Sequence, residues 1–191
     1  MTNLGPEFFC STIQAILKVR EPEGLRSAEI KSKVEQMHEA FYNIPYGISK
    51  LSEEEKVAVT RAYLSSDPFQ AIKKVIEIEM ASGIDIEKDD HIGKLYMTLV
   101  HSLFAGTYVS HQGEAQKVKE YFLNGGGIKL ALRELQYFQK YDEGNKYVDE
   151  IIEVYCGLLA SVYNKPALKE KFGEELREHD FYEIFRHYTT R

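Results

Sequence analysis

Three residues near the C-terminus have a spacing that could hold a metal ion. His179, Glu183 and His187 follow one another at intervals of four residues. On one helix they would form a stripe of nitrogen and oxygen ligands suited to zinc or another divalent cation. The HExxH arrangement of zinc proteases does not occur in the chain. We therefore interpret the stripe as the polar outer face of a terminal helix and expect no metal site.

A second group of possible metal ligands lies in one acidic segment, formed by the carboxylates of Asp85, Glu87, Asp89 and Asp90 and by His91. Its alternation is similar to the start of a calcium-binding loop. The glycine required at the sixth position is replaced by Asp90, and the glutamate required at the twelfth by Tyr96. We therefore predict a solvated loop between two helices, whose carboxylates favour the N-terminus of the helix that follows.

The remaining candidates for chemistry lack the partners that chemistry needs. Gly125, Gly126 and Gly127 precede a helix without the GK[ST] ending of a phosphate-binding loop, and they predict a sharp turn. A catalytic histidine needs a nucleophile or carboxylate that the fold places next to it, and the sequence alone establishes no such pairing for His91, His101 or His111, so we assign the three histidines to the surface or the edge of the core. Cys156 lies on an apolar helix and is expected to be a buried, unreactive thiol. We expect no catalytic residue and no cofactor.

Aromatic residues offer a different kind of site. The chain has 13 tyrosines and 10 phenylalanines but no tryptophan. Five tyrosines recur around its second half: Tyr137, Tyr141, Tyr147, Tyr155 and Tyr163. Tyrosine combines apolar area with a polar tip, so such a cluster suits partner recognition, although helical spacing also allows these rings to complete the edge of a core.

The elements that position these residues follow a repeat. One apolar pattern occurs twice, 56 residues apart and without gaps. Its first copy is Ile72, Val75, Ile76, Ile92, Leu95, Tyr96, Leu99 and Leu103, and its second is Ile128, Ala131, Leu132, Val148, Ile151, Ile152, Tyr155 and Leu159. Each copy predicts two amphipathic helices joined by a polar loop.

Helical periodicity continues through the rest of the chain, and sustained alternation of the kind found in strands is missing. We predict helices from Pro6 to about residue 20, from Ser27 to about 42, and from Ser52, a capping residue followed by three glutamates, to about Ser66. Further short helices are expected at 114–123, at 166–172 and at the C-terminus.

Composition limits the function classes. The net charge of −6 disfavours nonspecific binding to nucleic acid or to anionic membranes. No apolar run is long enough to span a membrane, and no secretory signal is evident. Two cysteines give no disulfide framework. We therefore expect a cytoplasmic or nuclear protein.

The stretch from Phe122 to Phe172 resembles armadillo-type helical repeats. The segment Leu123 to Ile128, with its three glycines, and the segment Asn164 to Leu168 flank two apolar helices in the order that this family uses. A weaker copy covers Phe69 to Phe122. The 56-residue spacing exceeds the roughly 40 to 47 residues of related repeats. Ala160 and Ser161 stand where the family carries a peptide-holding asparagine, so the resemblance implies the architecture and a protein partner rather than a particular binding mode.

We therefore predict an all-α protein of about eight to ten helices, an armadillo-like or HEAT-like right-handed stack of helical hairpins. We expect one domain over residues 1–191, with N-terminal helices at 1–66, repeat units at 67–123 and 124–172, and a cap helix at 173–191. Its expected role is noncatalytic binding of a basic peptide or helix of a partner protein. The residues assigned to that surface are Tyr147, Glu150, Val154, Ser161, Asn164, Lys94 and His101. A small-ligand-binding or enzymatic helical domain using the histidines and carboxylates is the alternative, and the oligomeric state stays open.

Overall fold

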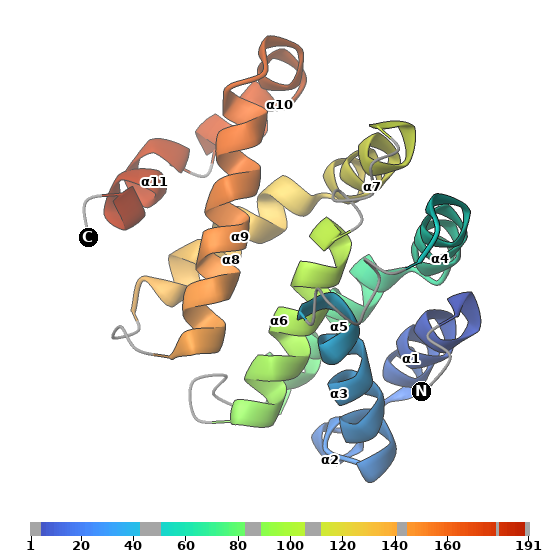
Figure 1. Cartoon of the computed structure of the whole chain (residues 1–191). Coiled ribbons are helices and arrows are strands. Elements are labelled where there is room, and N and C mark those ends of the chain that lie inside the picture. The colour runs from blue at the N-terminus through green and yellow to red at the C-terminus, as the bar shows by residue number, and fades with distance from the viewer. Residues whose placement is uncertain are drawn as a thin grey trace. The chain divides into compact units, whose positions relative to one another are not determined.

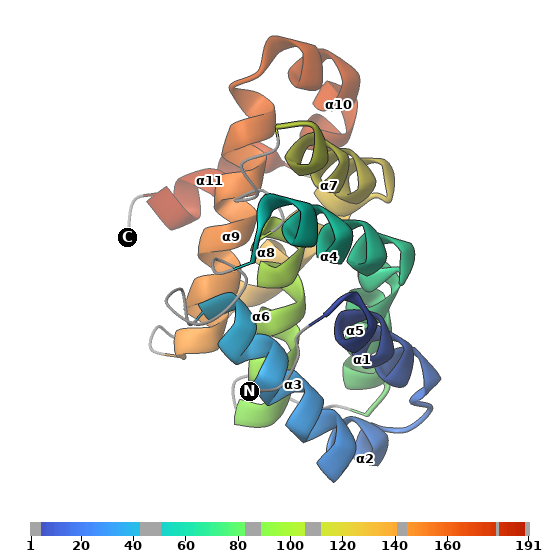
Figure 2. The ribbon, with the colours of Figure 1, turned by 45° about the vertical axis from the view of Figure 1, so that its right-hand side comes forward.

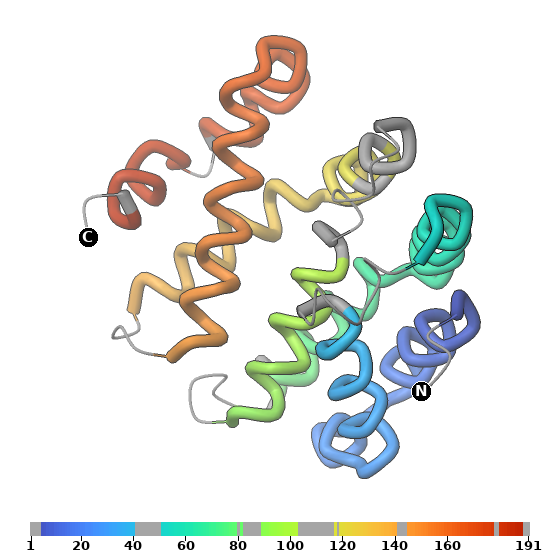
Figure 3. Tube along the Cα trace, viewed as in Figure 1, coloured from blue at the N-terminus to red at the C-terminus, as the bar shows by residue number. Residues whose placement is uncertain are grey.

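The computed structural model describes residues 5–42, 51–82, 89–105, 112–140, 145–178 and 180–189 (Figure 3). Within these ranges the protein is all-α, with eleven helices and no strand. The chain forms two compact units, unit 1 at Met1–Phe122 and unit 2 at Leu123–Arg191. The prediction of an all-α fold is confirmed.

Unit 1 is built from the first seven helices, the last of which ends two residues beyond its boundary. They are α1 (Pro6–Lys18), α2 (Pro22–Leu25), α3 (Ala28–Tyr42), α4 (Glu53–Ser65), α5 (Pro68–Ser82), α6 (Asp90–Ala105) and α7 (Gln112–Asn124). Helix α1 packs against α3, α4 and α5, and α6 packs against α3 and α5. Figures 1 and 2 show α1 beside α4 and α3 beside α6. The core holds Phe9, Ile13 and Ile16 of α1, each fully buried.

Local sequence signals start several of these helices. Pro6 stands at the first position of α1, where its fixed φ suits a helix and its missing N–H is no loss. The Ser52 hydroxyl accepts a hydrogen bond from the Glu55 amide at 3.3 Å, and the Ser52 amide donates to the Glu55 carboxylate at 2.8 Å. This reciprocal capping box starts α4 where the sequence predicts it.

The number of helices exceeds the predicted eight to ten because α2 is an additional single turn. The sequence predicts that the first helix ends near residue 20 and that the next begins at Ser27, but Pro22 begins α2 between them, at a position where proline is favoured. Leu25 is fully buried and anchors the turn. A Cβ atom at Gly24 would lie 2.8 Å from a methyl carbon of Val19, so glycine allows α2 to approach the end of α1.

Unit 2 consists of four helices: α8 (Gly127–Phe138), α9 (Lys146–Tyr163), α10 (Pro166–Glu178) and α11 (Phe181–Thr189). Helix α8 contacts the other three, and α10 also packs on α9 and α11. The helix starting at Pro166, predicted to end near residue 172, continues to Glu178 because Leu176 is buried and extends its apolar stripe.

The repeated apolar pattern identifies core faces in both units. In the first copy, the seven residues whose side chains are described are at most 3% exposed, and Leu103 lies outside the described side chains. In the second copy all residues are buried except Ile152, which is half-buried. Helix α5 packs on α6 in unit 1, and α8 packs on α9 in unit 2. None of the described helices is both long and apolar enough to cross a membrane.

Candidate functional site

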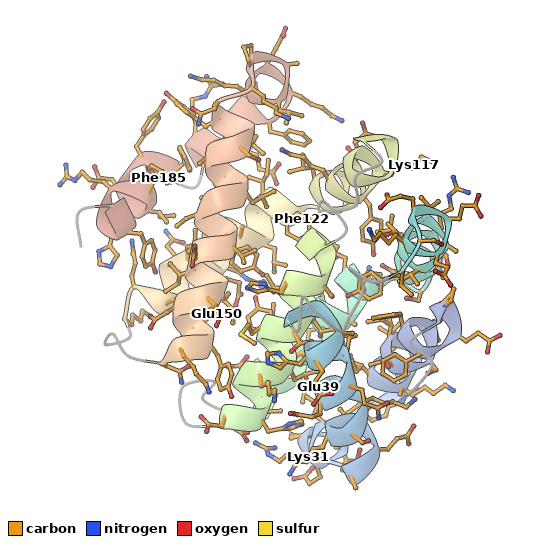
Figure 4. The ribbon with its side chains drawn as sticks, in the orientation of Figure 1. Lys31, Glu39, Lys117, Phe122, Glu150 and Phe185 are labelled. Atoms are coloured by element: carbon orange, nitrogen blue, oxygen red, sulfur yellow. The ribbon has the colours of Figure 1, made fainter. Side chains whose placement is uncertain are left out.

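Helix α9 carries four of the seven residues predicted to bind a partner, and its C-cap is a fifth. Its buried face consists of Val148, Ile151, Tyr155, Leu158, Leu159 and Val162. Beside this face, at helical spacing, run four half-buried residues: Tyr147, Glu150, Val154 and Ser161. Asn164 is exposed at the C-cap. Figure 4 labels Glu150 on the N-terminal half of α9. Four of the predicted residues therefore share one flank of a single helix.

Local hydrogen bonds set both ends of α9. The Asn145 side-chain oxygen accepts from the backbone amides of Tyr147 at 3.0 Å and Val148 at 3.2 Å, which caps the N-terminus. The Lys146 ammonium lies 4.8 Å from the centroid of the Tyr147 ring. Near the other end, the Ser161 hydroxyl donates to the Leu158 carbonyl at 2.8 Å. These contacts lie within α9 and its cap.

The outward side of α9 changes character along its length. Asp149 and Glu153 are exposed on the N-terminal half, next to the half-buried Glu150. Gly157 is exposed further along, and an added Cβ atom there would have no neighbour within 4 Å. We call these four residues, together with Val154 and Ser161, the α9 face. It combines a cluster of carboxylates with a stretch of small side chains.

The other two predicted residues, Lys94 and His101, lie on α6 in unit 1. The Lys94 ammonium forms an ion pair with Glu35 of α3. Hydrogen bonding to Lys94 lowers the pKa of the Glu35 carboxyl. His101 is half-buried and lies about two helical turns further along α6. On the same side of α6, the Thr98 hydroxyl lies 3.4 Å from Nδ1 of His38. Lys94 is thus engaged in the contact between α3 and α6.

In the acidic segment that resembles a calcium loop, Asp89 and His91 are half-buried and take part in packing, whereas Asp90 is exposed. Asp85 and Glu87 lie outside the described residues. Asp89 accepts hydrogen bonds from the His91 and Ile92 amides at 3.2 and 3.1 Å, and its other oxygen accepts from Arg26 Nε at 2.8 Å. Burial opposes ionisation of Asp89, but these hydrogen bonds and the Arg26 charge lower its pKa. The carboxylate thus caps α6, as the sequence predicts.

The histidines of this region are also engaged by the fold. Nε2 of His91 lies 2.8 Å from the Leu25 carbonyl oxygen, a hydrogen bond that ties α6 to α2. His111 lies outside the described residues. Asp89 and His91 therefore both connect α6 with the segment at Leu25 and Arg26.

The C-terminal stripe is only partly described. His179 lies outside the described residues, whereas Glu183 is exposed on α11. The His187 ring packs edge-on against Tyr188 with ring centroids 4.9 Å apart. Within the described ranges, no group of three histidine, cysteine, aspartate or glutamate side chains is placed to hold a metal ion.

The glycine run and the cysteines have structural explanations. Gly126 has φ +88°, in the left-handed region that favours glycine, and forms the turn between α7 and α8. Burial raises the pKa of the Cys156 thiol to about 11, so the unreactive protonated form dominates near neutral pH. The Cys10 thiol donates to the Ala62 carbonyl at 3.1 Å. Both cysteines are free.

The tyrosine cluster divides between core and surface. Tyr155 is fully buried, whereas Tyr137 is 40% exposed, Tyr163 is half-buried and Tyr141 lies outside the described residues. Tyr182, which is not among the five tyrosines singled out in the sequence, is 60% exposed and donates a hydrogen bond to the Tyr163 hydroxyl at 3.0 Å. This pairing joins α11 to α9, and no local spacing in the sequence indicates it.

Unit 1 also contains a groove between α1 and α3 that the sequence pattern did not predict. One side of α1 lines it with Ser11, Gln14, Ala15 and Lys18, at helical spacing. This stripe of small and polar residues opposite the core was a visible signal, but amphipathic periodicity alone does not show whether a polar face lines a groove.

Comparison of the chain with protein-family models, with curated proteins and with solved structures gave no match. The armadillo-type arrangement of the helices is therefore a proposal.

Proposed function

We propose that this protein is a noncatalytic interaction module that binds a basic helix or peptide of a partner protein on the α9 face. The carboxylates of Asp149 and Glu153 are exposed there and would pair with lysine or arginine side chains of the partner. Gly157 and Ser161 leave room for a helix to approach α9 closely. Lys94 is paired with Glu35, so the proposal depends on the α9 residues.

The observation that supports this proposal most is the exposed glycine at position 157, within α9. A glycine within a helix is less favourable than alanine by about 0.8 to 1 kcal/mol. Its φ is not positive, and a Cβ atom would meet nothing within 4 Å, so among the described residues neither conformation nor packing requires glycine at this position. Close contact with a partner helix supplies a reason for it. The armadillo-like stack of helical hairpins and a cytoplasmic or nuclear location belong to the same proposal.

The test uses a synthetic amphipathic helical peptide with leucine on one face and lysine on the other, and a version with glutamate in place of lysine. Isothermal titration calorimetry should detect binding of the lysine peptide and much weaker binding of the glutamate peptide. Glu153→Lys reverses a charge on the α9 face, and Gly157→Gln places a long side chain where the glycine leaves space. Each is expected to weaken binding about fivefold at low salt.

Glu174→Lys is the matched control, because Glu174 is exposed on α10 and its reversal changes the net charge equally. Circular dichroism verifies that each variant keeps its helices. Equal losses in Glu153→Lys and Glu174→Lys would show a general charge effect, and binding that Gly157→Gln leaves unchanged would place the peptide elsewhere.

A further inference from the structure

Unit 1 contains a groove of about 560 Å³ between α1 and α3. Ala15 and Val19 line it from the end of α1, and Ile30 lines it from α3. Ile30 is 3% exposed, and the other two side chains are half-buried. The groove therefore has an apolar part, and its volume lies within the range of about 300 to 1,000 Å³ that is typical of binding pockets.

Close packing of the backbone builds one end of this groove. Gly24 of α2 lies so near Val19 that a Cβ atom would be 2.8 Å from its methyl carbon. Ser27, which follows α2, accepts a hydrogen bond from the Ile30 amide at 3.3 Å and starts α3. The segment between α1 and α3 is thus fixed by the close approach at Gly24 and by the hydrogen bond at Ser27, and both residues line the groove.

Two lysines from opposite helices line the groove. Lys18 belongs to α1 and is exposed, and Lys33 belongs to α3 and is half-buried. The Lys33 ammonium donates to the Ser11 hydroxyl across the groove at 3.1 Å. Within the described part of the chain, neither lysine is paired with a carboxylate. By contrast, Lys56 and Lys94 each form an ion pair with a glutamate.

The charge of the groove differs from that of the chain. Its lining has two lysines and one acidic residue, the exposed Glu29, whereas the whole chain carries a net charge of −6. A local excess of positive charge beside apolar side chains favours a ligand that combines carboxylates with apolar groups. A basic segment would instead meet two unpaired ammonium groups.

We propose that this groove docks an acidic segment of another protein, with apolar side chains against Ala15, Val19 and Ile30 and carboxylates paired with Lys18 and Lys33. Because Lys18 and Lys33 come from opposite helices, an extended segment lying along the groove can reach both. This surface lies within unit 1 and does not depend on the proposed role of the α9 face in unit 2.

The test uses a fluorescein-labelled nonapeptide of alternating leucine and glutamate, titrated with the full chain and followed by fluorescence anisotropy at low salt. A peptide with glutamine in place of glutamate is its neutral counterpart. The glutamate peptide is expected to bind saturably, and the glutamine peptide about tenfold more weakly. Amide NMR shifts on titration should concentrate at Ala15, Ile30 and Lys33.

The double variant Lys18→Glu, Lys33→Glu is expected to weaken binding of the glutamate peptide at least about tenfold, because it removes two attractions and adds two repulsions. Lys31→Glu is the matched single control for Lys33→Glu. Lys31 is exposed on the same helix, labelled in Figure 4, and does not line the groove. Its reversal should change the affinity less than about twofold.

Three results would overturn the proposal. The first is the absence of saturable binding by the glutamate peptide up to about 1 mM. The second is equal binding of the glutamine peptide, and the third is an equal effect of Lys31→Glu and Lys33→Glu. If the charge-reversed double variant loses its helical circular dichroism, the double variant Lys18→Gln, Lys33→Gln takes its place in the binding comparison. It removes both charges without adding repulsion.

Discussion

Replacing Gly157 by alanine is expected to stabilise the protein. Gly157 lies in the interior of α9, is exposed, and would offer a Cβ atom open space to a distance of 4 Å. Alanine is more favourable than glycine within a helix by about 0.8 to 1 kcal/mol. With no clash to offset this gain, the free energy of unfolding should rise by about 1 kcal/mol.

The same substitution at Gly126 is expected to have the opposite sign. Gly126 has φ +88°, a conformation that costs an L-amino acid about 1 to 2 kcal/mol. An added Cβ atom there would also have no neighbour within 4 Å, so backbone strain is the difference between the two sites. Gly126→Ala should lower the free energy of unfolding by about 1 kcal/mol or more.

Urea denaturation followed by circular dichroism at 222 nm measures both changes. In thermal melts, Gly157→Ala should raise Tm by about 2–4 °C if the two units unfold together and by about 4–8 °C if unit 2 unfolds alone. Destabilisation by Gly157→Ala would show that the helix needs glycine for its own packing, and it would remove the argument for a close partner at this position. Stabilisation by Gly126→Ala would refute the strain argument.

Three further predictions concern contacts in the structure. Ser52→Ala should lower the free energy of unfolding by about 1 kcal/mol in urea titrations, because it removes the capping box of α4, and Ser52→Asn should restore most of it. Folding lowers the pKa of Asp89, so the ionised carboxylate stabilises the folded state. This stabilisation is fully present above the unfolded pKa of about 3.9 and is lost as the pH falls through the lower pKa of the folded state. The destabilisation caused by Asp89→Asn, about 1 kcal/mol at pH 7 for this partly exposed pair, should therefore shrink below pH ~3, and a pH-independent difference would contradict the linkage. The raised pKa of Cys156 should make its alkylation by iodoacetamide at pH 8 about tenfold slower in the native protein than in urea, allowing for partial exposure, and equal rates would contradict burial of the thiol.

Sequence reasoning succeeded where a structural feature depends on neighbours along the chain. The Ser52 capping box, the left-handed turn at Gly126 and the start of α1 at Pro6 each depend on residues within one helical turn. The repeated apolar pattern identified the faces that α6 and α9 bury, because helical periodicity alone determines which residues share a face. The single turn of α2 was missed because its stability depends on burial of Leu25 among distant residues.

For the candidate surfaces, the sequence predicts which residues share a helix face but not which residues of other helices they contact. The alignment of Tyr147, Glu150 and Val154 along α9 follows from helical spacing and was predictable. The pairing of Lys94 with Glu35, 59 residues away, was not. A charged residue on a helix has the same local signature whether it faces solvent or an ion-pair partner on another helix.

The sequence by itself determined that this protein is helical, where α1 and α4 begin, and which side of each repeat helix enters a core. Periodicity, capping residues and glycine or proline conformations act over a few residues, so they can be read along the chain. Only the tertiary structure decided that Asp89 meets Arg26 across 63 residues, and that the polar side of α1 lines a groove with α3. These features depend on how separate helices pack, and many packings are compatible with the same amphipathic pattern.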